Sequence, residues 1–257
     1  MPPLLEIKGL TKNFGGLAAV RNLDFTVNKG ELVGLIGPNG AGKTTVFNLI
    51  TGILPPTNGR VVFKGEDITD LRADQVAQRG VVRTFQLTNL FMNYSTLQNV
   101  LMAQALHCRI GFWGALFNPS TTRNREEELH HRAMEILEVV GLVPLKDGLA
   151  KNLPHGHQRA LGIAIALATE PELLLLDEPV TGMNPDETLT MMARINKIRD
   201  TGVTVLLVEH DMRAVMGFCE RILVLSYGSK IAEGSPQEIK ENKEVIEAYL
   251  GSGKYAT

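Results

Sequence analysis

Cysteine is scarce in the 257-residue sequence: Cys108 and Cys219 lie far apart and form no Cys-x-x-Cys pair. This excludes a disulfide framework and a zinc knuckle, and it suits thiols kept in a reducing interior. A basic excess is also lacking, because 26 Lys and Arg stand against 28 Asp and Glu, for a net charge of −2. We therefore expect no nucleic-acid partner, since proteins that bind nucleic acid usually carry a strong basic surplus.

Long apolar runs are lacking as well. The longest spans residues 160–168, about half of what crosses a bilayer. The first residues, MPPLLEIKGL, carry Glu6 and lack the basic-then-apolar layout of a signal peptide. We therefore expect no transmembrane segment and no signal peptide. With 44% hydrophobic and 21% charged residues, the chain has the composition of a globular protein, either one large α/β domain or a domain with a smaller insert.

Two different strand patterns divide the chain. The first 65 residues alternate in short segments, and the glycines between them predict turns. From residue 173 the strands become almost continuously apolar, which is typical of a parallel sheet buried on both faces by helices. The first set covers 4–10, 18–30, 31–37 and 59–65, punctuated by Gly9, Gly15, Gly16, Gly30 and Gly59, and the second covers 173–177, 203–209 and 221–225.

Helix starts are predicted where Asn184 and Ser235 each precede a proline and a glutamate three residues on. Residues 87–157 differ, with few strand signals and one clear helix that Gly141 ends. Its apolar face holds Leu129, Ala133, Ile136, Leu137 and Val140. The sequence thus predicts one domain over 1–257, with a catalytic core and β subdomain in 1–86 and 158–250, a helical insert in 87–157 and a loose tail in 251–257.

The segment GPNGAGKT, residues 37–44, follows an apolar strand and precedes a helical pattern. This is the context that the phosphate-binding P-loop requires, and a plain glycine-rich turn is the alternative. Lys43 is expected to reach the β- and γ-phosphates, and the Thr44 hydroxyl to ligate Mg²⁺. The predicted nucleotide-binding residues here are Gly37, Pro38, Asn39, Gly40, Ala41, Gly42, Lys43, Thr44 and Thr45.

Acidic side chains follow the apolar strand at 173–177. Asp177 ends it and Glu178 comes next, on the side where open α/β sheets bind ligands. Asp177 suits a second contact to Mg²⁺, and Glu178 suits a general base that polarises the attacking water; capping of the next turn is the alternative for both. His210 ends the following strand, where an imidazole can contact a γ-phosphate oxygen.

The order of these motifs resembles that of ABC-transporter nucleotide-binding domains. After the P-loop come Gln86 in RTFQ, a helical stretch, a Leu-x-x-Gly-x-Gln segment, LLLLDEP and VEHD. The GxxRTFQ form, EPVTGMNP and VEHDM look most like the LivG-like ATP-binding subunits of branched-chain amino acid importers. The resemblance covers essentially the whole chain. It implies an α/β fold, with a RecA-like P-loop NTPase core, an N-terminal antiparallel β subdomain and an inserted α-helical subdomain.

The resemblance also implies roles for single residues. Phe14 stands where an aromatic ring usually stacks on adenine, with Val20 nearby, and a core phenylalanine is the alternative. Gln86 would touch Mg²⁺ and the attacking water and would connect the helical insert to the site. The resemblance therefore gives catalytic roles to Glu178, His210 and Gln86, and Mg²⁺ contacts to Thr44, Gln86 and Asp177.

Residues 153–158, LPHGHQ, stand where the family usually has LSGGQ. In the family this signature loop acts in trans, on the ATP held by a partner domain. Gly156 keeps the close approach to phosphate, but Pro154 replaces the serine and lacks both the hydroxyl and the N–H. A lost hydrogen bond to a charged phosphate costs about 1.5–3 kcal/mol. The predicted signature residues are Leu153, Pro154, His155, Gly156, His157 and Gln158.

Two histidines in this loop leave alternatives open. His155 or His157 is a replacement donor to phosphate, and a better one when protonated. A metal site on the pair is the weaker alternative, because acidic or thiol ligands are lacking nearby. The position that is usually aspartate in the family's EPxTGxD segment is Asn184.

The resemblance implies an ATPase that uses ATP and Mg²⁺ and powers import of branched-chain or related amino acids by dimer closure. Because the altered signature would impair one site of a heterodimer but both sites of a homodimer, we expect a second, LivF-like ATPase subunit. The other expected partners are two integral-membrane permease subunits and, indirectly, a substrate-binding protein. The chain would sit peripherally on the cytoplasmic face of the inner membrane.

Two other functions compete with this interpretation. A soluble ABC ATPase of DNA repair or translation usually carries coiled-coil arms, zinc motifs or tandem ATPase domains, and the sequence has none of these. A P-loop kinase or GTPase leaves Gln86, the signature segment and His210 unexplained, and the guanine-specific motif is absent. The solute stays open, since the ATPase subunit never touches it; urea, amides and other amino acids remain alternatives.

The stretch after Gln86 is richly apolar, as is 110–117 with Trp113. In the family, a cleft near here receives a cytoplasmic helix of the permease. The alternative for Leu90, Phe91 and Leu97 is that they form the core of the insert.

Overall fold

The computed structural model describes residues 2–84, 90–107, 119–210 and 212–250. Its framework is two β-sheets, a four-stranded antiparallel sheet in the order β2-β1-β4-β5 and a six-stranded sheet in the order β10-β9-β3-β8-β7-β6. The first sheet consists of β1 (Leu5–Phe14), β2 (Leu17–Val27), β4 (Asn58–Phe63) and β5 (Glu66–Asp67). The second consists of β3 (Leu32–Ile36), β6 (Val81–Arg83), β7 (Leu173–Asp177), β8 (Thr204–Val208), β9 (Arg221–Ser226) and β10 (Ser229–Gly234).

The six-stranded sheet is parallel except for β10, which pairs with β9 in the antiparallel sense. Strands β3, β7 and β8 are buried at every residue, as their continuous apolar patterns predict. Alternate residues of each strand face two different cores. Leu174 and Leu176 pack with the helices on one face, whereas Leu173 and Leu175 pack against the antiparallel sheet on the other.

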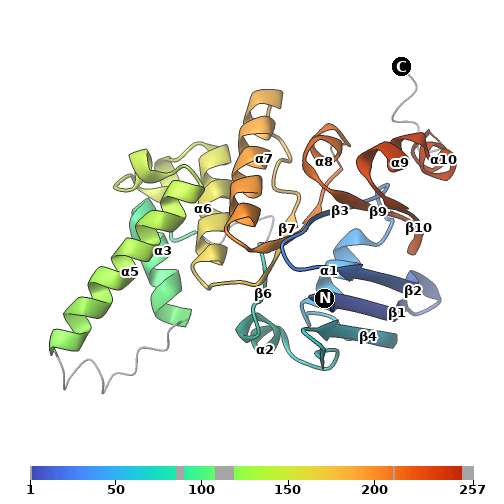
Figure 1. Ribbon diagram of the computed structural model, residues 1–257, viewed down its shortest axis with the longest axis horizontal. Helices are drawn as coiled ribbons and strands as arrows, with labels where there is room; N and C mark the ends of the chain where they lie inside the picture. The colour runs from blue at the N-terminus through green and yellow to red at the C-terminus, as the bar shows by residue number, and fades with distance from the viewer. Residues whose placement is uncertain (1, 85–89, 108–118, 211, 251–257) are drawn as a thin grey trace.

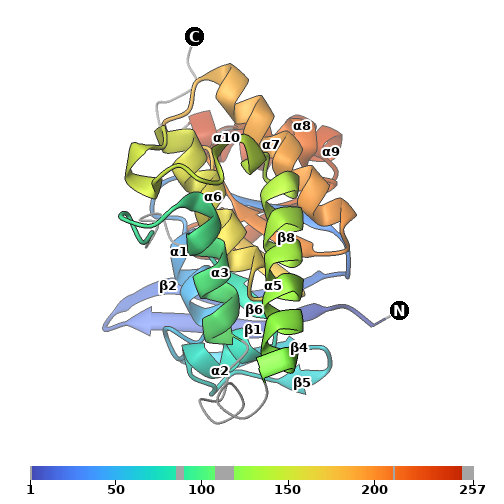
Figure 2. The same ribbon diagram turned by 90° about the vertical axis from the view of Figure 1, so that its left-hand side faces the viewer.

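Most helices pack on the face of the parallel sheet that lies away from the antiparallel one (Figure 1), whereas α1 and α2 contribute to the core that the two sheets share. Three of them, α3, α5 and α6, stand at one end of the molecule, and Figure 2 views them from that side. The helices are α1 (Lys43–Ile50), α2 (Ala73–Gln78), α3 (Thr96–His107), α5 (Pro119–Val139), α6 (His155–Leu167), α7 (Pro185–Asp200), α8 (Met212–Phe218), α9 (Pro236–Glu241) and α10 (Lys243–Leu250), with short 3₁₀ turns at Val143–Leu145 and Ala150–Asn152.

Local sequence chemistry explains several helix ends. Asn184 and Ser235 each accept a hydrogen bond from the backbone N–H three residues on, so both predicted capping boxes are confirmed. In α5 and just beyond it, Ala133, Leu137 and Val140 are buried, as the predicted apolar face requires. Gly141 follows with φ of 69°, a left-handed conformation that ends the helix.

Two glycines expected in turns lie inside strands instead. Gly9 (φ 57°) sits within β1, where the pairing with β2 shifts between Ile7 and Leu10 as in a β-bulge. Gly59 (φ 90°) lies within β4, and a Cβ there would come 2.3 Å from the carbonyl oxygen of Gly9. The two glycines therefore let neighbouring strands approach at a bulge, which a turn signal in the sequence does not distinguish.

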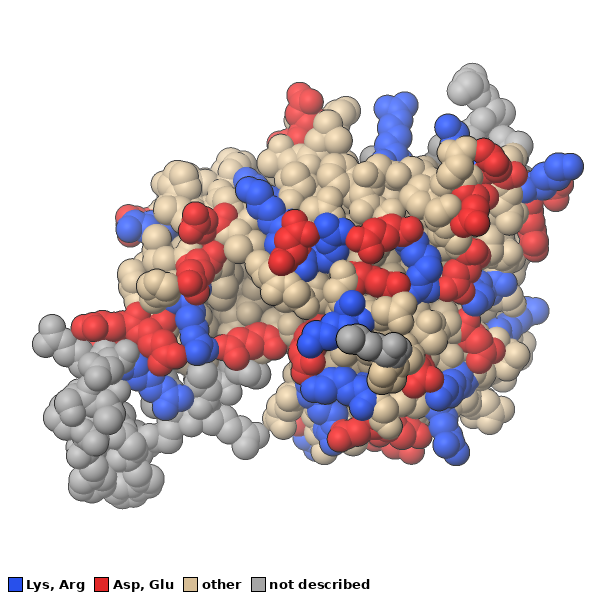
Figure 3. All heavy atoms as spheres, viewed as in Figure 1, with Lys and Arg blue, Asp and Glu red and all other residues tan. Residues whose placement is uncertain are grey.

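None of the helices in the described ranges is both long and apolar enough to cross a bilayer. On the face seen in Figure 3, the described Lys and Arg side chains are interspersed with Asp and Glu, so no large field of one sign covers it.

Candidate functional site

The P-loop joins the central strand β3 to α1, and its backbone requires glycine at both ends. Gly37 has φ of 155°, and a Cβ there would lie 2.2 Å from the carbonyl oxygen of Leu225. Gly42 has φ of 102°, and a Cβ there would lie 2.5 Å from the carbonyl oxygen of Ala19. No side chain caps α1, which begins one residue later. A tight loop that ends at an uncapped helix N-terminus is an anion site, since backbone N–H groups and the helix dipole both favour negative charge.

Lys43 folds back over this loop. It is only 8% exposed, and its Nζ donates hydrogen bonds to the carbonyl oxygens of Gly37 (2.7 Å) and Pro38 (3.0 Å). Burial lowers the pKa of Lys43, while the nearby carboxylates of Glu178 and Asp177 act in the opposite direction. The ammonium group is thus held between the loop and the acidic ends of the neighbouring strands.

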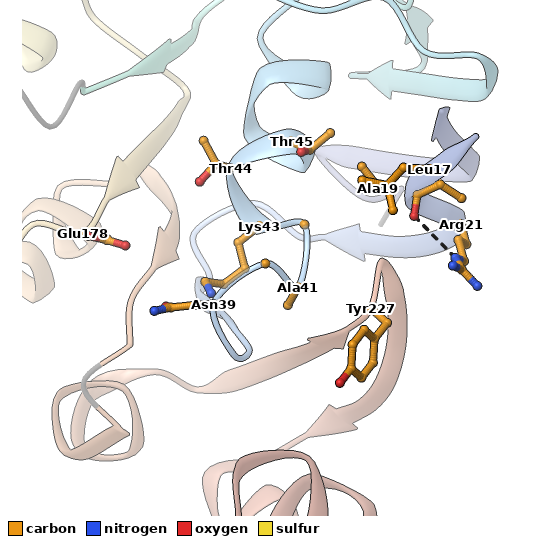
Figure 4. A pocket seen from close by; sticks show the side chains of 13 residues that line it. Leu17, Ala19, Arg21, Asn39, Ala41, Lys43, Thr44, Thr45, Glu178 and Tyr227 are labelled. Atoms are coloured by element: carbon orange, nitrogen blue, oxygen red, sulfur yellow. Dashed lines mark hydrogen bonds between the residues drawn. The ribbon is translucent and has the colours of Figure 1, made fainter. Parts of the chain in front are cut away.

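A cavity of about 360 Å³ opens over the loop. In Figure 4, the P-loop side chains form its centre, Glu178 lies on one side, and Ala19, Arg21 and Tyr227 lie on the other. The cavity therefore brings together the predicted phosphate loop and the predicted general base from separate elements. Its lining consists of Leu17, Ala18, Ala19, Arg21, Asn39, Gly40, Ala41, Gly42, Lys43, Thr44, Thr45, Glu178 and Tyr227.

Asp177, at the end of β7, is 5% exposed. Its Oδ2 accepts a hydrogen bond from Arg83 Nη2 at 2.5 Å, whereas Oδ1 is buried and has no hydrogen-bond partner among the described residues. Such an unpaired oxygen is costly unless a ligand satisfies it. Together with the Thr44 hydroxyl in the first turn of α1, it supplies the hard oxygen donors that Mg²⁺ prefers, so the residues fit that ion.

Glu178 has a left-handed backbone, with φ of 50°, which is uncommon for a residue with a side chain. Its N–H donates to Val208 O (2.9 Å), and its carbonyl oxygen accepts from Arg159 Nη1 (2.7 Å). The Thr181 hydroxyl donates to Oε2 at 3.3 Å. These contacts hold the strained turn, and they connect Glu178 to the helix α6, which carries Arg159.

His210 follows β8 and lies beside two carboxylates. Its Nδ1 is 3.8 Å from Glu178 Oε1 and 3.8 Å from Glu209 Oε2, with half of the imidazole side chain exposed. Glu209 is fully buried, and its Oε1 accepts a hydrogen bond from the backbone N–H of Val180 at 2.8 Å. The structure thus brings His210 next to Glu178, and Glu209 holds the turn that follows Glu178 through its bond to Val180.

Phe14 and Val20, the two residues predicted to lie near the adenine base, differ in how exposed they are. Phe14 is 47% exposed, and Lys12 Nζ lies 5.3 Å from its ring centroid, so Phe14 is not a core residue. Val20 is fully buried in the core, and its neighbours on β2 line the cavity instead. The aromatic side chain that lines the cavity is Tyr227, 85% exposed on the turn between β9 and β10. Gln86 lies outside the described residues.

None of residues 153–158 lines this cavity. Pro154 is the N-cap of α6 and provides no side-chain cap. Leu153 is buried, and Gln158 Nε2 donates back to the carbonyl oxygens of Ala150 (3.3 Å) and Leu153 (3.0 Å). Proline is tolerated at this position because the N-cap residue donates no N–H within the helix, but it cannot supply the hydroxyl that often caps a helix N-terminus.

His157 is one of the two histidines proposed as replacement donors to phosphate, a role that protonation would strengthen. Burial and the nearby Arg194 lower its pKa, although Glu187 counteracts them. The lowered pKa of His157 disfavours the protonated imidazole, which would be the better donor to phosphate. In the part of the chain that the structure describes, no group of three or more His, Cys, Asp or Glu residues is placed to hold a metal ion.

Several site residues were missed by the sequence reasoning. Arg83, Arg159, Glu209 and Tyr227 come from four different elements or turns. Arg83 belongs to the RTFQ segment, in which only Gln86 was given a role, and Glu209 belongs to VEHD, in which only His210 was given one. Each motif therefore contains a second site residue. Arg159 and Tyr227 have no local signal, because their partners lie far away in the chain.

The fold and this site define a P-loop nucleotide-binding protein: a phosphate loop follows the central strand of a parallel sheet, and carboxylates end the next strands. Residues 20–181 match the family model described as ABC transporter. Residues 229–255 match a second model, described as branched-chain amino acid ATP-binding cassette transporter. The chain belongs to the ABC transporter family of ATP-binding ATPases.

Known relatives match along nearly the whole length. The branched-chain amino acid transport ATP-binding protein BraF of Pseudomonas aeruginosa is 44% identical over 250 residues, which cover 97% of this chain and 98% of BraF. The corresponding LivG of Escherichia coli is 43% identical with the same coverage. The ADP conformation of MJ1267, an ATP-binding cassette of an ABC transporter, superimposes with a TM-score of 0.84 at 30% identity, covering 98% of this chain and all of MJ1267. The predicted fold class is thereby confirmed.

Proposed function

We propose that this chain is the ATP-hydrolysing subunit of a membrane importer for branched-chain or related amino acids. The observation that carries the activity is the cavity in which the P-loop with its buried Lys43 faces Glu178. The amino-acid assignment is supported by the names of relatives at 43–44% identity and by the family model that matches residues 229–255. The chain itself has no solute site in this proposal.

Nucleotide binding follows from the loop. The phosphates lie at the N-terminus of α1, where backbone N–H groups and Lys43 balance their charge. The Thr44 hydroxyl, Asp177 Oδ1 and Gln86 would hold Mg²⁺, and the ion would neutralise the charge that develops on the phosphates. The base lies at the end of the cavity that Tyr227 and residues of β2 line, whereas Phe14, at the end of β1, is not among the lining residues.

Hydrolysis requires a polarised water next to the γ-phosphate. Glu178 is the general base, since its carboxylate borders the phosphate side of the cavity and its left-handed turn is fixed by three hydrogen bonds. His210, 3.8 Å from that carboxylate, contacts the γ-phosphate and fixes the orientation of Glu178. Preorganisation of these groups is what accelerates the reaction.

The assembly that we propose is a head-to-tail heterodimer with a second, LivF-like ATPase. Because residues 153–158 do not line their own chain's cavity, they are available to the ATP of a partner. The two subunits bind two integral-membrane permeases at the cytoplasmic face of the inner membrane, and a substrate-binding protein delivers the solute. The helical part that carries this loop, 87–157, is proposed to move as one unit against the core.

The surface proposed for the permease helix lies just before α3. There Phe91, Met92 and Tyr94 are each about two-fifths exposed, and the rings of Phe91 and Tyr94 meet edge to face at 6.0 Å. Leu90 and Leu97 pack against the core instead. For Leu90 and Leu97, the alternative of a role in the core is therefore favoured. The contact with the permease helix is assigned to the exposed side chains of Phe91, Met92 and Tyr94. Trp113 lies outside the described residues.

The proposal is tested with Glu178→Gln, measured in the complex with the second ATPase. Removing a general base should lower kcat for ATP hydrolysis at least about 100-fold, while ATP binding and ATP-dependent dimer formation persist, as judged by light scattering. Glu135→Gln, an exposed carboxylate on α5, is the matched control and should leave turnover unchanged. Undiminished hydrolysis by Glu178→Gln would refute the mechanism.

A further inference from the structure

Arg83 ends the edge strand β6, and its side chain is only 7% exposed. The guanidinium group reaches two elements at once. Nη2 donates to Asp177 Oδ2 at the end of β7, and Nη1 donates to Asn48 Oδ1 on α1, each at 2.5 Å. The Cζ atom also lies 5.5 Å from the ring centroid of Phe47, within the range of a cation–π contact.

These contacts make the two oxygens of Asp177 unequal. Arg83 occupies Oδ2, while Oδ1 is buried without a hydrogen-bond partner among the described residues. A planar guanidinium is suited to this task, because its fork spans two acceptors in fixed geometry, which an ammonium group cannot do. The hydrogen bond from Arg83 thereby orients the carboxylate and leaves Oδ1 available to an incoming ligand.

Arg83 also relates that oxygen to the phosphate loop. Asn48 lies on α1, whose first turn contains Lys43 and Thr44. The hydrogen bond to Asn48 therefore fixes the distance between α1 and the end of β7. Thr44 and Asp177 are the two groups of these elements that fit Mg²⁺, so their separation determines whether one ion can contact both.

We propose that Arg83 is a positioning residue for Mg²⁺-nucleotide binding: it holds Asp177 by one oxygen and α1 by Asn48, so that Asp177 Oδ1 and Thr44 address one ion. This inference rests on the Mg²⁺ role proposed for Asp177. Arg83 itself touches neither the metal nor the nucleotide. Partners of this kind are usually worth about 10- to 100-fold in metal affinity.

The test measures binding of a fluorescent ATP analogue to the purified chain, first with excess EDTA and then across a Mg²⁺ titration. The variants are Arg83→Met, Arg83→Lys and the control Arg79→Met. Arg79 makes a loose ion pair with Glu66 at 3.6 Å and donates to the carbonyl oxygen of Gln75 at 3.2 Å. For Arg83→Met we expect unchanged affinity in EDTA and a half-maximal Mg²⁺ concentration raised about tenfold or more. Arg83→Lys keeps the charge without the fork, so it should give a smaller rise, and Arg79→Met none.

Asp177→Asn separates this inference from the function on which it rests. If Arg83 acts through Asp177, then adding Arg83→Lys to Asp177→Asn should produce no further rise in the Mg²⁺ requirement. If Asp177→Asn raises the requirement but neither Arg83 variant does, the positioning role is refuted and the Mg²⁺ site stands. If Asp177→Asn has no effect, the proposed Mg²⁺ site itself is refuted.

If Arg83 only stabilised the fold, its variants would give a different binding result. It would weaken analogue binding equally in EDTA and in Mg²⁺, and this result would also overturn the inference. Should Arg83→Met fail to fold, Arg83→Lys alone decides between these outcomes, since it retains the buried positive charge opposite Asp177.

Discussion

Burial sets the protonation of two basic side chains that face phosphate groups in the proposed dimer. Lys43 is 8% exposed and has a lowered pKa, but the carboxylates of Glu178 and Asp177 favour its charged form. His157 has a lowered pKa as well, and its largest electrostatic neighbour, Arg194, is positive. Burial thus favours the neutral form of both side chains, but carboxylates oppose it at Lys43 whereas Arg194 adds to it at His157.

A prediction at this scale concerns His157→Gln. Because the pKa of His157 is lower in the folded than in the unfolded state, the unfolded state takes up the proton first as the pH falls through about 6.5. His157 therefore adds nothing to stability at higher pH, and it destabilises the fold progressively below its ordinary pKa. Thermal unfolding should show that His157→Gln loses less stability than the parent chain between neutral and mildly acidic pH.

The control for this experiment is His130→Gln, a substitution at an exposed position of α5. It should leave the pH dependence of the parent unchanged. Equal losses for the His157→Gln variant and the parent would contradict the assignment.

At the scale of elements, β3 packs so closely against α8 that position 34 has room only for glycine. A Cβ on Gly34 would lie 2.8 Å from Val215 Cγ1 and 3.1 Å from Cys219 Sγ. Cys219 is buried there, and burial raises the pKa of its thiol to about 12. The strand that leads to the P-loop is thus held against this helix without room for another methyl group.

Gly34→Ala should accordingly destabilise the chain by about 1–3 kcal/mol, as overpacking of a core does. Adding Val215→Ala should recover part of that loss, because it removes the methyl group nearest to the new Cβ. Gly217→Ala is the matched control: it lies on the exposed side of α8 with no atom within 4 Å of the new Cβ, and alanine is the better helix former. Urea unfolding measures all four proteins, and a neutral Gly34→Ala would contradict the packing.

Elements with a regular pattern were predictable from the sequence, and contacts between them were not. The five residues of β7 are continuously apolar, and Asn184 carries a complete capping box, so both were located from sequence alone. Strand β6 has only three residues, too few for a periodic signal. Arg83 and Asp177 are 94 positions apart, and no local pattern reports such a pair. The roles assigned to Gln86, Phe14 and the boundaries at 87 and 157 remain predictions.

At the scale of the whole molecule, the proposed dimer requires this chain to contribute two half-sites that face different nucleotides. The P-loop cavity is lined by Lys43 and Glu178, whereas Pro154 and its neighbours lie apart from it at the start of α6. Arg159, one turn into α6, nevertheless donates to the carbonyl oxygen of Glu178. In the proposed dimer, the first residues of α6 would therefore contact the partner's nucleotide, while Arg159 of the same helix holds the backbone of Glu178.

Pro154→Ser is predicted to reveal this asymmetry. Restoring the hydroxyl and the N–H should raise turnover at the partner's site by up to about ten- to a hundredfold, the rate equivalent of a hydrogen bond to a charged phosphate. ATP hydrolysis is measured for the chain alone and for the complex in which only one subunit carries an active general base. Full activity of the chain alone, unchanged by Pro154→Ser, would rule out the asymmetric dimer.

The strand order has a consequence for how the protein is made. Strand β3, which ends at the P-loop, pairs with β8 and β9, and both are synthesised only after some 170 further residues have left the ribosome. Until then the nascent chain holds a wholly apolar strand with both edges open, the kind of segment that associates wrongly with other chains. The ability to bind phosphate therefore comes late in biogenesis, although the loop that provides it is among the first parts translated.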